Sequence, residues 1–417
     1  MIKKKKKIEL LSPINNYDSL YAAINSGADS VYFGVENLNM RSIKNNFNIK
    51  DISKISNICI KNNIKKYLTL NSIIYDNDIL LVKKILNESK NNKIDGVIAM
   101  DNFVINYSNK LKLPIHISTQ LNITNLESLK FYSKFSDILV LSRELNLNQI
   151  KYICNQINKL NIKGFSKKKI KIEIFCHGSL CMAISGKCYI SLHSYNSSAN
   201  RGACKQNCRR KYIVKDKKSN LKMLIDNEYI MSPKDLCTIN FLDKIINAGI
   251  SVLKIEGRGK SPEYISVCTK CYKEAILSIK NKTYNKEKIL YWINELKKVY
   301  NRGFWNGYYL GQKLGEWVKK DNSLSTKKKI FIGIIKKYYN KKKIMILKIQ
   351  SLKLKINDKI YIIGNKIGVI KYKIISLRNN NKKNVKYIKK NNICSSYIPF
   401  KVYKNNKIYK IISNNNK

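Results

Sequence analysis

The stretch Ala22-Ala23-Ile24-Asn25-Ser26-Gly27-Ala28-Asp29-Ser30 joins the end of an amphipathic helix to the start of an apolar run. Gly27 stands where a helix C-cap is expected, since glycine readily adopts the left-handed backbone conformation that ends many helices. Late in the chain, Asn247-Ala248-Gly249-Ile250-Ser251 repeats this pattern before another apolar run. A helix that ends on glycine and leads directly into a buried strand is typical of domains in which helices and strands alternate.

Apolar runs of strand length recur as far as Glu256, and most segments between them have helical periodicity, as in Ile52–Asn62, Ile79–Ser89 and the shorter Leu126–Tyr132. The runs predict eight strands: Glu9–Ser12, Ser30–Val35, Tyr67–Ile73, Val97–Asp101, Ile115–Gln120, Ile138–Ser142, Ile170–Cys176 and Val252–Glu256. Eight alternating β and α units predict an α/β fold, a TIM-like (β/α)8 barrel.

The chain is expected to have three parts. Residues 1–283 form the barrel, and its seventh strand is followed by a long cysteine-bearing insertion at about 177–240. Such a loop would emerge at the face of the barrel that carries active sites. A helical connector follows at 284–327, with helical patterns at Pro262–Ile279 and Lys286–Tyr300 on either side of its start.

Residues 328–417 are expected to form a small C-terminal antiparallel β-barrel, because short β-rich runs and polar turns replace the helical patterns. The predicted strands are Ile330–Ile335, Ile344–Ile349, Lys359–Ile363, Ile367–Ile375, Phe400–Tyr403 and Ile408–Ile412.

The composition leaves two interpretations of the charge open. The chain has 417 residues, a formal net charge of +54 and 44% hydrophobic residues, a content that excludes wholesale disorder. The charge indicates either a nucleic-acid partner or a lysine-rich composition throughout, since the lysines are spread along the chain. The basic segment Met1–Lys7 precedes no apolar core of a signal peptide, and no run has the length of a membrane span. Eleven cysteines without an export signal favour the reducing cytoplasm and no membrane partner.

The segment Glu173–Ser191 reads EIFCHGSLCMAISGKCYIS and opens a group of cysteines in polar, loop-rich surroundings. Four of them are the usual complement of a 4Fe-4S cluster, for which the candidates are Cys181, Cys188, Cys204 and Cys237. Cys208 is a fifth candidate in the same insertion. Buried structural thiols are the alternative interpretation, and it suits Cys59, Cys154 and Cys394 on apolar faces.

Zinc is the alternative metal. Cys268-Thr269-Lys270-Cys271 is the chain's one CxxC, and with Cys204 and Cys208 it would supply four sulfurs. Cys268 and Cys271 lie in an amphipathic helical run, however, where this spacing also places two side chains on one face. The pattern therefore favours iron–sulfur over zinc.

Polar residues at or near the predicted C-terminal strand ends would face the mouth of the barrel. They are Asn71, Asp101, Gln120, Arg143, Glu144, His177, Glu256 and Arg258. Arg143 and Arg258 are candidates for binding an acidic small molecule through bidentate contacts. The alternative is that Arg143–Glu144 and Glu256–Arg258 are structural ion pairs.

The chain resembles the collagenase-like peptidase family, whose signature reads E-x-F-x-x-G-[SA]-x-C-x(4)-G-x-C-x-x-S. Every fixed position is matched, by Glu173, Phe175, Gly178, Ser179, Cys181, Gly186, Cys188 and Ser191. The resemblance continues through Asn200-Arg201-Gly202-Ala203-Cys204, Ser232-Pro233-Lys234-Asp235-Leu236-Cys237 and Lys254-Ile255-Glu256-Gly257-Arg258. It thus covers nearly the whole predicted barrel.

The resemblance implies an oxygen-independent hydroxylase with a 4Fe-4S cluster, despite the peptidase name. The small C-terminal barrel points to the tRNA hydroxylation branch, which converts wobble-position uridine to 5-hydroxyuridine and requires prephenate. The resemblance assigns the cluster to Cys181, Cys188, Cys204 and Cys237 and implies an electron donor. A collagenase-like peptidase and a hydroxylase of ribosomal RNA are the alternative functions.

Overall fold

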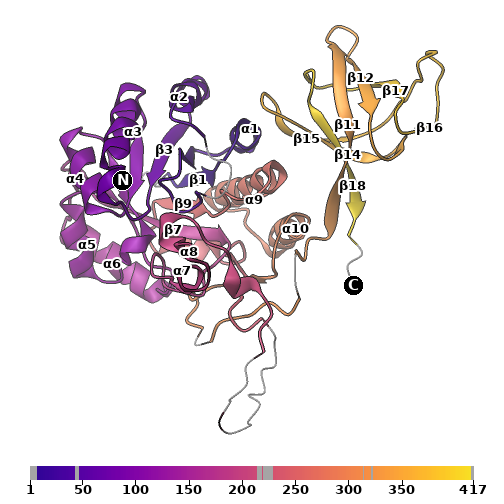
Figure 1. Cartoon of the computed structure of the whole chain (residues 1–417). Coiled ribbons are helices and arrows are strands. Elements are labelled where there is room, and N and C mark those ends of the chain that lie inside the picture. The colour runs from indigo at the N-terminus through magenta and orange to yellow at the C-terminus, as the bar shows by residue number, and fades with distance from the viewer. Residues whose placement is uncertain are drawn as a thin grey trace.

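The computed structural model describes residues 7–42, 47–213, 218, 229–312, 314–320 and 323–414. Its larger part is a closed barrel of eight parallel strands, surrounded by helices (Figure 1). The strands are β1 (Glu9–Pro13), β2 (Ser30–Gly34), β3 (Lys65–Leu70), β4 (Gly96–Ala99), β5 (Ile115–Ile117), β6 (Ile138–Val140), β7 (Lys171–Gly178) and β9 (Val252–Ile255). Each pairs with the next, and β9 closes the ring by pairing with both β7 and β1. The predicted (β/α)8 barrel is confirmed.

Helices follow the strands and cover the outside of the barrel (Figure 1). They are α1 (Tyr17–Asn25), α2 (Asp51–Lys61), α3 (Ile79–Asn91), α4 (Asn102–Lys110), α5 (Leu126–Ser133), α6 (Leu147–Lys159), α8 (Leu242–Asn247) and α9 (Pro262–Lys280). Gly27 follows α1 with φ +86°, and Gly249 follows α8 with φ +101°. Both glycines therefore end a helix and direct the chain into the next strand, as their sequence pattern predicts.

Side-chain alternation separates the outer face of the barrel from its interior. Leu10, Val31 and Leu253 belong to the main core shared with the helices. Side chains at the alternate strand positions point the other way and form a separate buried cluster that faces the barrel axis: Leu11, Tyr32, Tyr67, Ile98 and Val252. Since successive side chains of a strand point to opposite faces, every second residue along the strand from Val252 also faces inward. Polar side chains at such positions are thereby brought together along the axis.

Two short strands extend the barrel at its cysteine-bearing side, and the sequence did not indicate either. β8 (Asp235–Cys237) pairs antiparallel with the end of β7, and β10 (Phe304–Trp305) pairs parallel with β8. The short helix α7 (Ile190–Tyr195) lies in the insertion, part of which falls outside the described residues.

The segment expected as a connector packs closely on the barrel. Helix α10 (Lys286–Leu296) is shorter than the predicted Lys286–Tyr300. Trp292, Leu296, Trp305 and Tyr309 are buried members of the main core.

The C-terminal part is an antiparallel β domain, as predicted. Its sheet follows the order β15-β14-β18-β11-β12-β17, and within residues 323–414 the edge strands β15 and β17 are not paired with each other. The strands are β11 (Lys327–Tyr339), β12 (Ile344–Ile349), β14 (Lys359–Gly364), β15 (Gly368–Lys373), β17 (Ile393–Tyr397) and β18 (Lys407–Ser413). A two-stranded ribbon of β13 (Leu354–Lys355) and β16 (Tyr387–Ile388) completes the domain.

One predicted strand of this domain is wrong. Residues Phe400–Tyr403 are irregular, and Phe400 is 47% exposed. The strand that pairs with β12 is instead β17, Ile393–Tyr397, whose small residues Cys394 and Ser396 face the core. Hydrophobicity alone misplaces such a strand because small inward side chains give a weak apolar signal.

The C-terminal domain packs beside helices α1 and α9, mainly through β15 (Figure 1). Asn25 Nδ2 donates a hydrogen bond to the Ile367 carbonyl at 2.9 Å, and Lys329 Nζ lies 2.7 Å from Glu263 Oε2. Across the part of the chain that the structure describes, no helix is long and apolar enough to span a membrane.

Candidate functional site

Four cysteine thiols of the insertion gather at the mouth of the barrel. Cys181 is exposed, and Cys188, Cys204 and Cys208 are partly buried. Burial raises the pKa of Cys208, Arg209 lowers it, and the other three thiols, Cys181, Cys204 and Cys188, raise it further. Thiols influence one another's pKa in this way only at short range. The four thiols are therefore close enough to interact electrostatically.

Glycines allow this loop to approach the barrel closely. Gly186 has φ +77°, and a Cβ atom there would lie 3.0 Å from the Gln120 side chain. Gly202 has φ +87°, and a Cβ atom there would lie 2.0 Å from the Asn39 carbonyl oxygen. Only glycine meets both the backbone and the space requirement at these positions.

Arg209 holds the loop in place beside Cys208. Its guanidinium donates hydrogen bonds to the Pro233 carbonyl at 2.7 Å, to Ser232 Oγ at 3.1 Å and to the Leu180 carbonyl. One partly buried cation thus links three segments that are distant in sequence, and it lies next to the thiols.

Cys237, the fourth thiol of the predicted ligand set, lies on β8 and is not among the thiols that act on the pKa of Cys208. It is 5% exposed on β8, and the Tyr272 hydroxyl lies 3.9 Å from its sulfur. Burial raises the pKa of Cys237 to about 11, and its thiol neighbours are Cys176 and Cys268. The hairpin-like pairing of β8 with β7 turns Cys237 towards α9, so Cys208 is the fourth thiol at the mouth.

The CxxC pair proposed for zinc lies in the interior. Cys268 and Cys271 are 0% and 3% exposed on α9, where they neighbour Cys237 rather than Cys204 and Cys208. Among the described residues, no three His, Cys, Asp or Glu side chains are arranged to hold one metal ion. A cubane cluster binds each thiolate through a different iron, so its ligands stand farther apart than those of one zinc ion.

A cavity of about 90 Å³ lies at the mouth of the barrel next to Cys181. Five of the predicted site residues line it: Asn71, Gln120, Arg143, Glu256 and Arg258. Asn71 Nδ2 donates a hydrogen bond to Gln120 Oε1 at 2.7 Å, so these side chains from neighbouring strand ends are in direct contact. The structure thus brings five of the predicted rim residues to one cavity.

The cavity is rich in cations. Arg41 and Lys254 also line it, and Arg41 Nη2 lies 3.1 Å from Glu256 Oε1. Arg258 Nη1 donates to Asn39 Oδ1 and Thr69 Oγ1, both at 2.7 Å.

Neither Arg143 nor Arg258 pairs with a carboxylate among the described ion pairs, so the alternative Arg143–Glu144 and Glu256–Arg258 pairs are not formed. Arg143 Nη1 donates to the Ser179 carbonyl at 3.2 Å, and its guanidinium stacks over the Phe175 ring at 4.0 Å. Two arginines are thus available for an anionic ligand.

A buried charge network supports the floor of this cavity. Glu173 Oε1 accepts from Lys254 Nζ at 2.9 Å, and Glu173 Oε2 lies 2.8 Å from His116 Nδ1. Burial would raise the pKa of Glu173, but Lys254 and His116 outweigh it and lower the pKa to about 2. The ionised carboxylate fixes the Lys254 ammonium beneath the cavity.

Three residues predicted for the rim lie elsewhere. His177 is 2% exposed and packs against the Tyr264 and Tyr272 rings, and burial lowers its pKa to about 3. Glu144 lines a neighbouring cavity and accepts a hydrogen bond from Ser142 Oγ. Asp101 caps helix α4 by accepting from the Phe103 amide at 2.9 Å.

Arg41 and Lys254 belong to the cavity, although sequence reasoning did not name them as site residues. The sequence could have indicated Lys254, because it lies two residues before Glu256 and four before Arg258, so all three side chains point to the same face at the end of the strand. Arg41 follows β2 in an irregular segment, where no periodicity indicates which way a side chain points.

The fold and this site define an α/β-barrel enzyme whose thiol-bearing insertion covers the catalytic face. The chain belongs to peptidase family U32, whose sequence model matches residues 15–319. It is similar to a protein named collagenase from Porphyromonas gingivalis, with 50% identity over 89% of this chain and 90% of that protein.

Other relatives have names that refer to RNA. The tRNA hydroxylation protein P1 of Bacillus subtilis is 30% identical over 80% of this chain and 78% of that protein. The 23S rRNA 5-hydroxycytidine C2501 synthase of Escherichia coli is 34% identical over 66% of this chain, but over only 40% of that protein.

Proposed function

We propose that this protein hydroxylates uridine at C5 in tRNA, at the wobble position, in a prephenate-dependent and oxygen-independent reaction. The observation that carries the proposal is the group of four thiols beside a cationic cavity at the catalytic face of the barrel. Relatives named for tRNA hydroxylation support the choice of substrate.

The residues at the mouth fit a 4Fe-4S cluster. Cys181, Cys188, Cys204 and Cys208 would hold it, since four neighbouring thiols are its usual ligand set and glycines let the backbone come close. The cluster would supply one-electron redox chemistry beside the cavity. Hydroxylation of an unactivated C5 position needs such a centre, together with a source of oxygen and an electron partner.

The mouth cavity is suited to an acidic co-substrate. Arg143 and Arg258 have no carboxylate partner among the described ion pairs, and Lys254 is held in place by Glu173. Prephenate carries two carboxylates, and bidentate arginine contacts recognise carboxylates with defined orientation. These side chains would bind and orient the acid next to Cys181.

The C-terminal domain is suited to dock the RNA. Residues 328–417 contain 25 Lys and Arg but one acidic residue, Asp358, whereas the remaining 56 of 81 basic and 26 of 27 acidic residues lie in residues 1–327. The acidic side chains that balance lysines are thus almost confined to the barrel. A surface of this kind attracts phosphates by releasing counterions.

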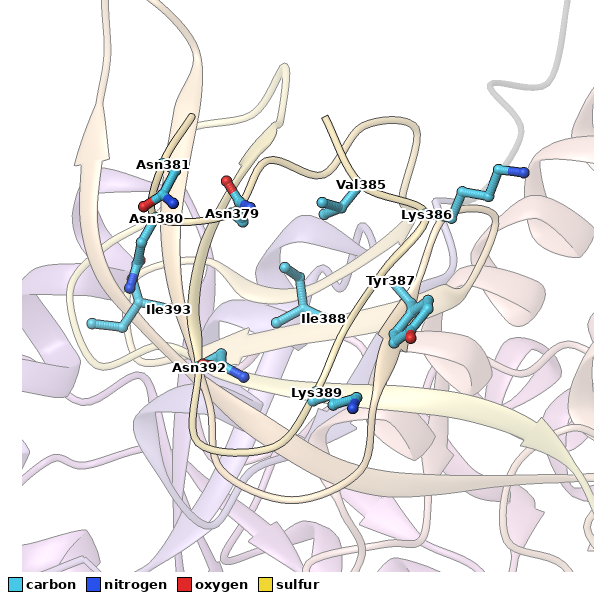
Figure 2. A pocket seen from close by; sticks show the side chains of 10 residues that line it. All are labelled: Asn379, Asn380, Asn381, Val385, Lys386, Tyr387, Ile388, Lys389, Asn392 and Ile393. Carbon is cyan, nitrogen blue, oxygen red and sulfur yellow. The ribbon is translucent and has the colours of Figure 1, made fainter. Parts of the chain in front are cut away.

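A cavity of about 630 Å³ lies in this domain. Figure 2 shows the lysine and asparagine side chains around it. Lys386 and Lys389 flank Tyr387, which is 49% exposed. Cations beside an accessible aromatic ring are typical of surfaces that bind phosphates and unstacked bases. We place the protein in the cytoplasm, where its tRNA substrate is found.

Peptidase activity is the second candidate because a 50% identical relative is named collagenase. The described residues contain no Ser, Thr or Cys side chain hydrogen-bonded to a histidine. His116 is occupied by Glu173, and burial raises the pKa of Cys176 well above its usual value. A nucleophile needs an adjacent base or a lowered pKa, so this geometry does not favour hydrolysis.

Complementation tests the proposal. A bacterial strain that lacks its own tRNA hydroxylation protein receives either the wild-type chain or Cys181→Ala, and tRNA nucleosides are measured by mass spectrometry. We expect 5-hydroxyuridine with the wild type and its loss with Cys181→Ala, while tRNA binding is kept. Full modification with Cys181→Ala, or cleavage of denatured collagen by the purified protein, contradicts the proposal. Anaerobic spectroscopy of the purified protein distinguishes iron–sulfur from zinc.

A further inference from the structure

A cavity of about 700 Å³, the interdomain cavity, lies between the barrel and the C-terminal domain. Helices α9 and α10 line one side of it, and β14, β15 and the irregular segment 400–403 line the other (Figure 1). Burial raises the pKa of Tyr361 on β14 to about 12, and Glu263 on α9 and Glu295 on α10 raise it further. Charges act in this way only at short range, so side chains of the two domains face each other across the cavity.

The lysines of the C-terminal side carry charge that no acidic side chain balances. On the barrel side, Glu263 Oε2 lies 2.7 Å from Lys329 Nζ, and Glu295 pairs with Lys298, so both carboxylates are already neutralised. On the other side, three exposed lysines line the cavity and have no carboxylate partner among the described ion pairs: Lys366, Lys371 and Lys401. The interdomain cavity therefore has an excess of positive charge.

Aromatic rings accompany these lysines. Lys366 Nζ and Lys401 Nζ lie 5.3 Å and 5.5 Å from the centroid of the Tyr403 ring. Phe400 on the same side is 47% exposed, and Tyr291 on α10 is 53% exposed. The interdomain cavity thus offers cations together with accessible rings, and the two domains each supply one of the exposed rings.

We propose that the interdomain cavity binds unpaired nucleotides of the tRNA substrate. Lys366, Lys371 and Lys401 would contact phosphates, and Phe400 and Tyr291 would stack on bases. The inference rests on the proposed function for the identity of the RNA, and it adds a docking site that is divided between the two domains.

Other partners would leave part of this site unused. The bases of an RNA duplex stack on one another and do not present their faces to protein rings. An acidic polypeptide would pair with the lysines but has no flat bases to stack on Phe400 and Tyr291. Unpaired nucleotides carry both phosphates and free base faces, and proteins that bind them combine a positively charged groove with aromatic side chains.

The salt dependence of RNA binding tests the lysines. Full-length protein is titrated with a short fluorescein-labelled single-stranded RNA at several salt concentrations, and fluorescence anisotropy gives the affinity. Each phosphate contact of a single strand contributes about 0.7 to the slope of log affinity against log salt. Lys366→Gln, Lys371→Gln and Lys401→Gln combined should therefore lower the magnitude of this slope by about 2.

A triple variant with the same loss of charge is the matched control. Lys341→Gln, Lys342→Gln and Lys343→Gln lie in the exposed turn between β11 and β12, towards the sheet edge opposite β15. They should leave the slope unchanged. Equal changes in the two triple variants would show that the RNA is attracted by the charged surface in general, and would overturn the proposal.

Replacement of an exposed ring tests the stacking. Phe400→Ala should weaken binding of the single strand about tenfold and leave the salt slope unchanged, because a stacked base is lost but no phosphate contact. Phe131→Ala is the control, since Phe131 is 54% exposed on α5, which lies away from the C-terminal domain (Figure 1). All replaced side chains are exposed, and thermal unfolding of each variant confirms that it is folded.

Two competitors identify the partner. An RNA duplex with the same number of phosphates and a poly-glutamate peptide should each displace the labelled single strand less well than unlabelled single strand does. Equal competition by the duplex, or an unchanged affinity in Phe400→Ala, would exclude unpaired nucleotides from the cavity. Equal competition by poly-glutamate would identify an acidic polypeptide as the partner instead.

Two outcomes separate the inference from the function it rests on. If the wild type binds the single strand but the folded cavity variants bind it as the wild type does, the docking site is wrong while tRNA hydroxylation stands. If the wild type binds no RNA and yields no 5-hydroxyuridine in cells, the proposed function fails as well.

Discussion

The thiols at the mouth of the barrel and the thiols in its interior are the same chemical group in two different environments. Those at the mouth, Cys181, Cys188, Cys204 and Cys208, are exposed or partly buried and lie beside Arg209. Those in the interior, Cys176, Cys237, Cys268 and Cys271, are buried, and burial raises the pKa of each. Neutral buried thiols pack as small apolar side chains, whereas accessible ones can become ligands.

Charged groups show the same division. In the interior, Glu173 is matched by Lys254 and His116, so the network satisfies itself. At the mouth, Arg41 is paired with Glu256, whereas Arg143 and Arg258 form no ion pair with a carboxylate among the described residues. Charged side chains that are fully paired stabilise the fold. Charged side chains that form no ion pair remain available to bind a ligand.

The largest expected effect distinguishes two cysteines. Cys208→Ala should lose the visible absorption of the cluster and most of its iron, because a ligand at the mouth is removed. Cys237→Ala should keep both and lose about 1 kcal/mol of unfolding free energy, as a small buried side chain does. Iron analysis and absorption spectra of anaerobically reconstituted proteins measure the difference. Loss of the cluster in Cys237→Ala and its retention in Cys208→Ala would identify Cys237 as the fourth ligand.

Removal of the interior carboxylate tests whether the paired charges are structural. Glu173→Gln should lower the unfolding free energy by about 3–5 kcal/mol, since Lys254 is left buried without its partner. Glu127→Gln is the control, because its ion pair with Lys130 is exposed and contributes less than about 1 kcal/mol. Urea unfolding at neutral pH measures both. Equal effects of the two substitutions would remove the distinction between interior and surface pairs.

The same carboxylate predicts a pH dependence. The pKa of Glu173 is lowered to about 2 in the folded protein, from an ordinary value of 4.5. The unfolded chain therefore binds the proton first as pH falls, and the stability that Glu173 provides is complete above pH 4.5 and is lost towards pH 2. The difference between wild type and Glu173→Gln should shrink over this window in acid unfolding curves.

Replacement of a mouth arginine should affect binding more than folding. Arg258→Lys keeps the charge but loses the planar donor pair, so KM for prephenate should rise about tenfold. Affinity for tRNA should stay within about twofold, since phosphate contacts depend on the C-terminal domain. Arg378→Lys is the control, because it makes the same substitution in the C-terminal domain, and it should leave KM for prephenate unchanged. An unchanged KM in Arg258→Lys would exclude this arginine from the acid site.

The smallest effect concerns Lys260, whose ammonium lies 3.4 Å from the centroid of the Tyr300 ring. Burial lowers its pKa to about 8, although Asp235 and Glu256 oppose the shift. Between pH 8 and the ordinary value of 10.5, the unfolded chain holds the proton more firmly, so stability rises with pH. Lys260→Gln should flatten this rise by an amount on the order of 1 kcal/mol in urea unfolding.

The barrel was predictable because its signals are local. Each strand is a short apolar run, each helix has its own periodicity, and Gly27 and Gly249 mark helix ends within a few residues. Boundaries shifted where an apolar run continues past the last paired residue, as in β3, which ends at Leu70 rather than Ile73. Strands β8 and β10 were missed because three and two residues become strands only through partners distant in the chain.

The candidate site was predictable in part for the same reason. Asn71, Gln120, Arg143, Glu256 and Arg258 converge because strand ends of a parallel barrel meet at one face. His177 carried the same signal, yet a local bulge in β7 and the overlying rings of Tyr264 and Tyr272 enclose it. Trp305 and Trp317, which line the neighbouring cavity together with Glu144, carried no such signal, since both come from the segment after the barrel.

Patterns of apolar residues and glycines were thus sufficient for the barrel and for the presence of a thiol-rich insertion above it, because short-range forces govern both. The proposed choice of Cys208 over Cys237 and the pairing of Lys254 with Glu173 depend on how loops close across space. Burial and charge pairing depend on the spatial distances between residues that are far apart in the chain. These distances cannot be obtained from the sequence alone.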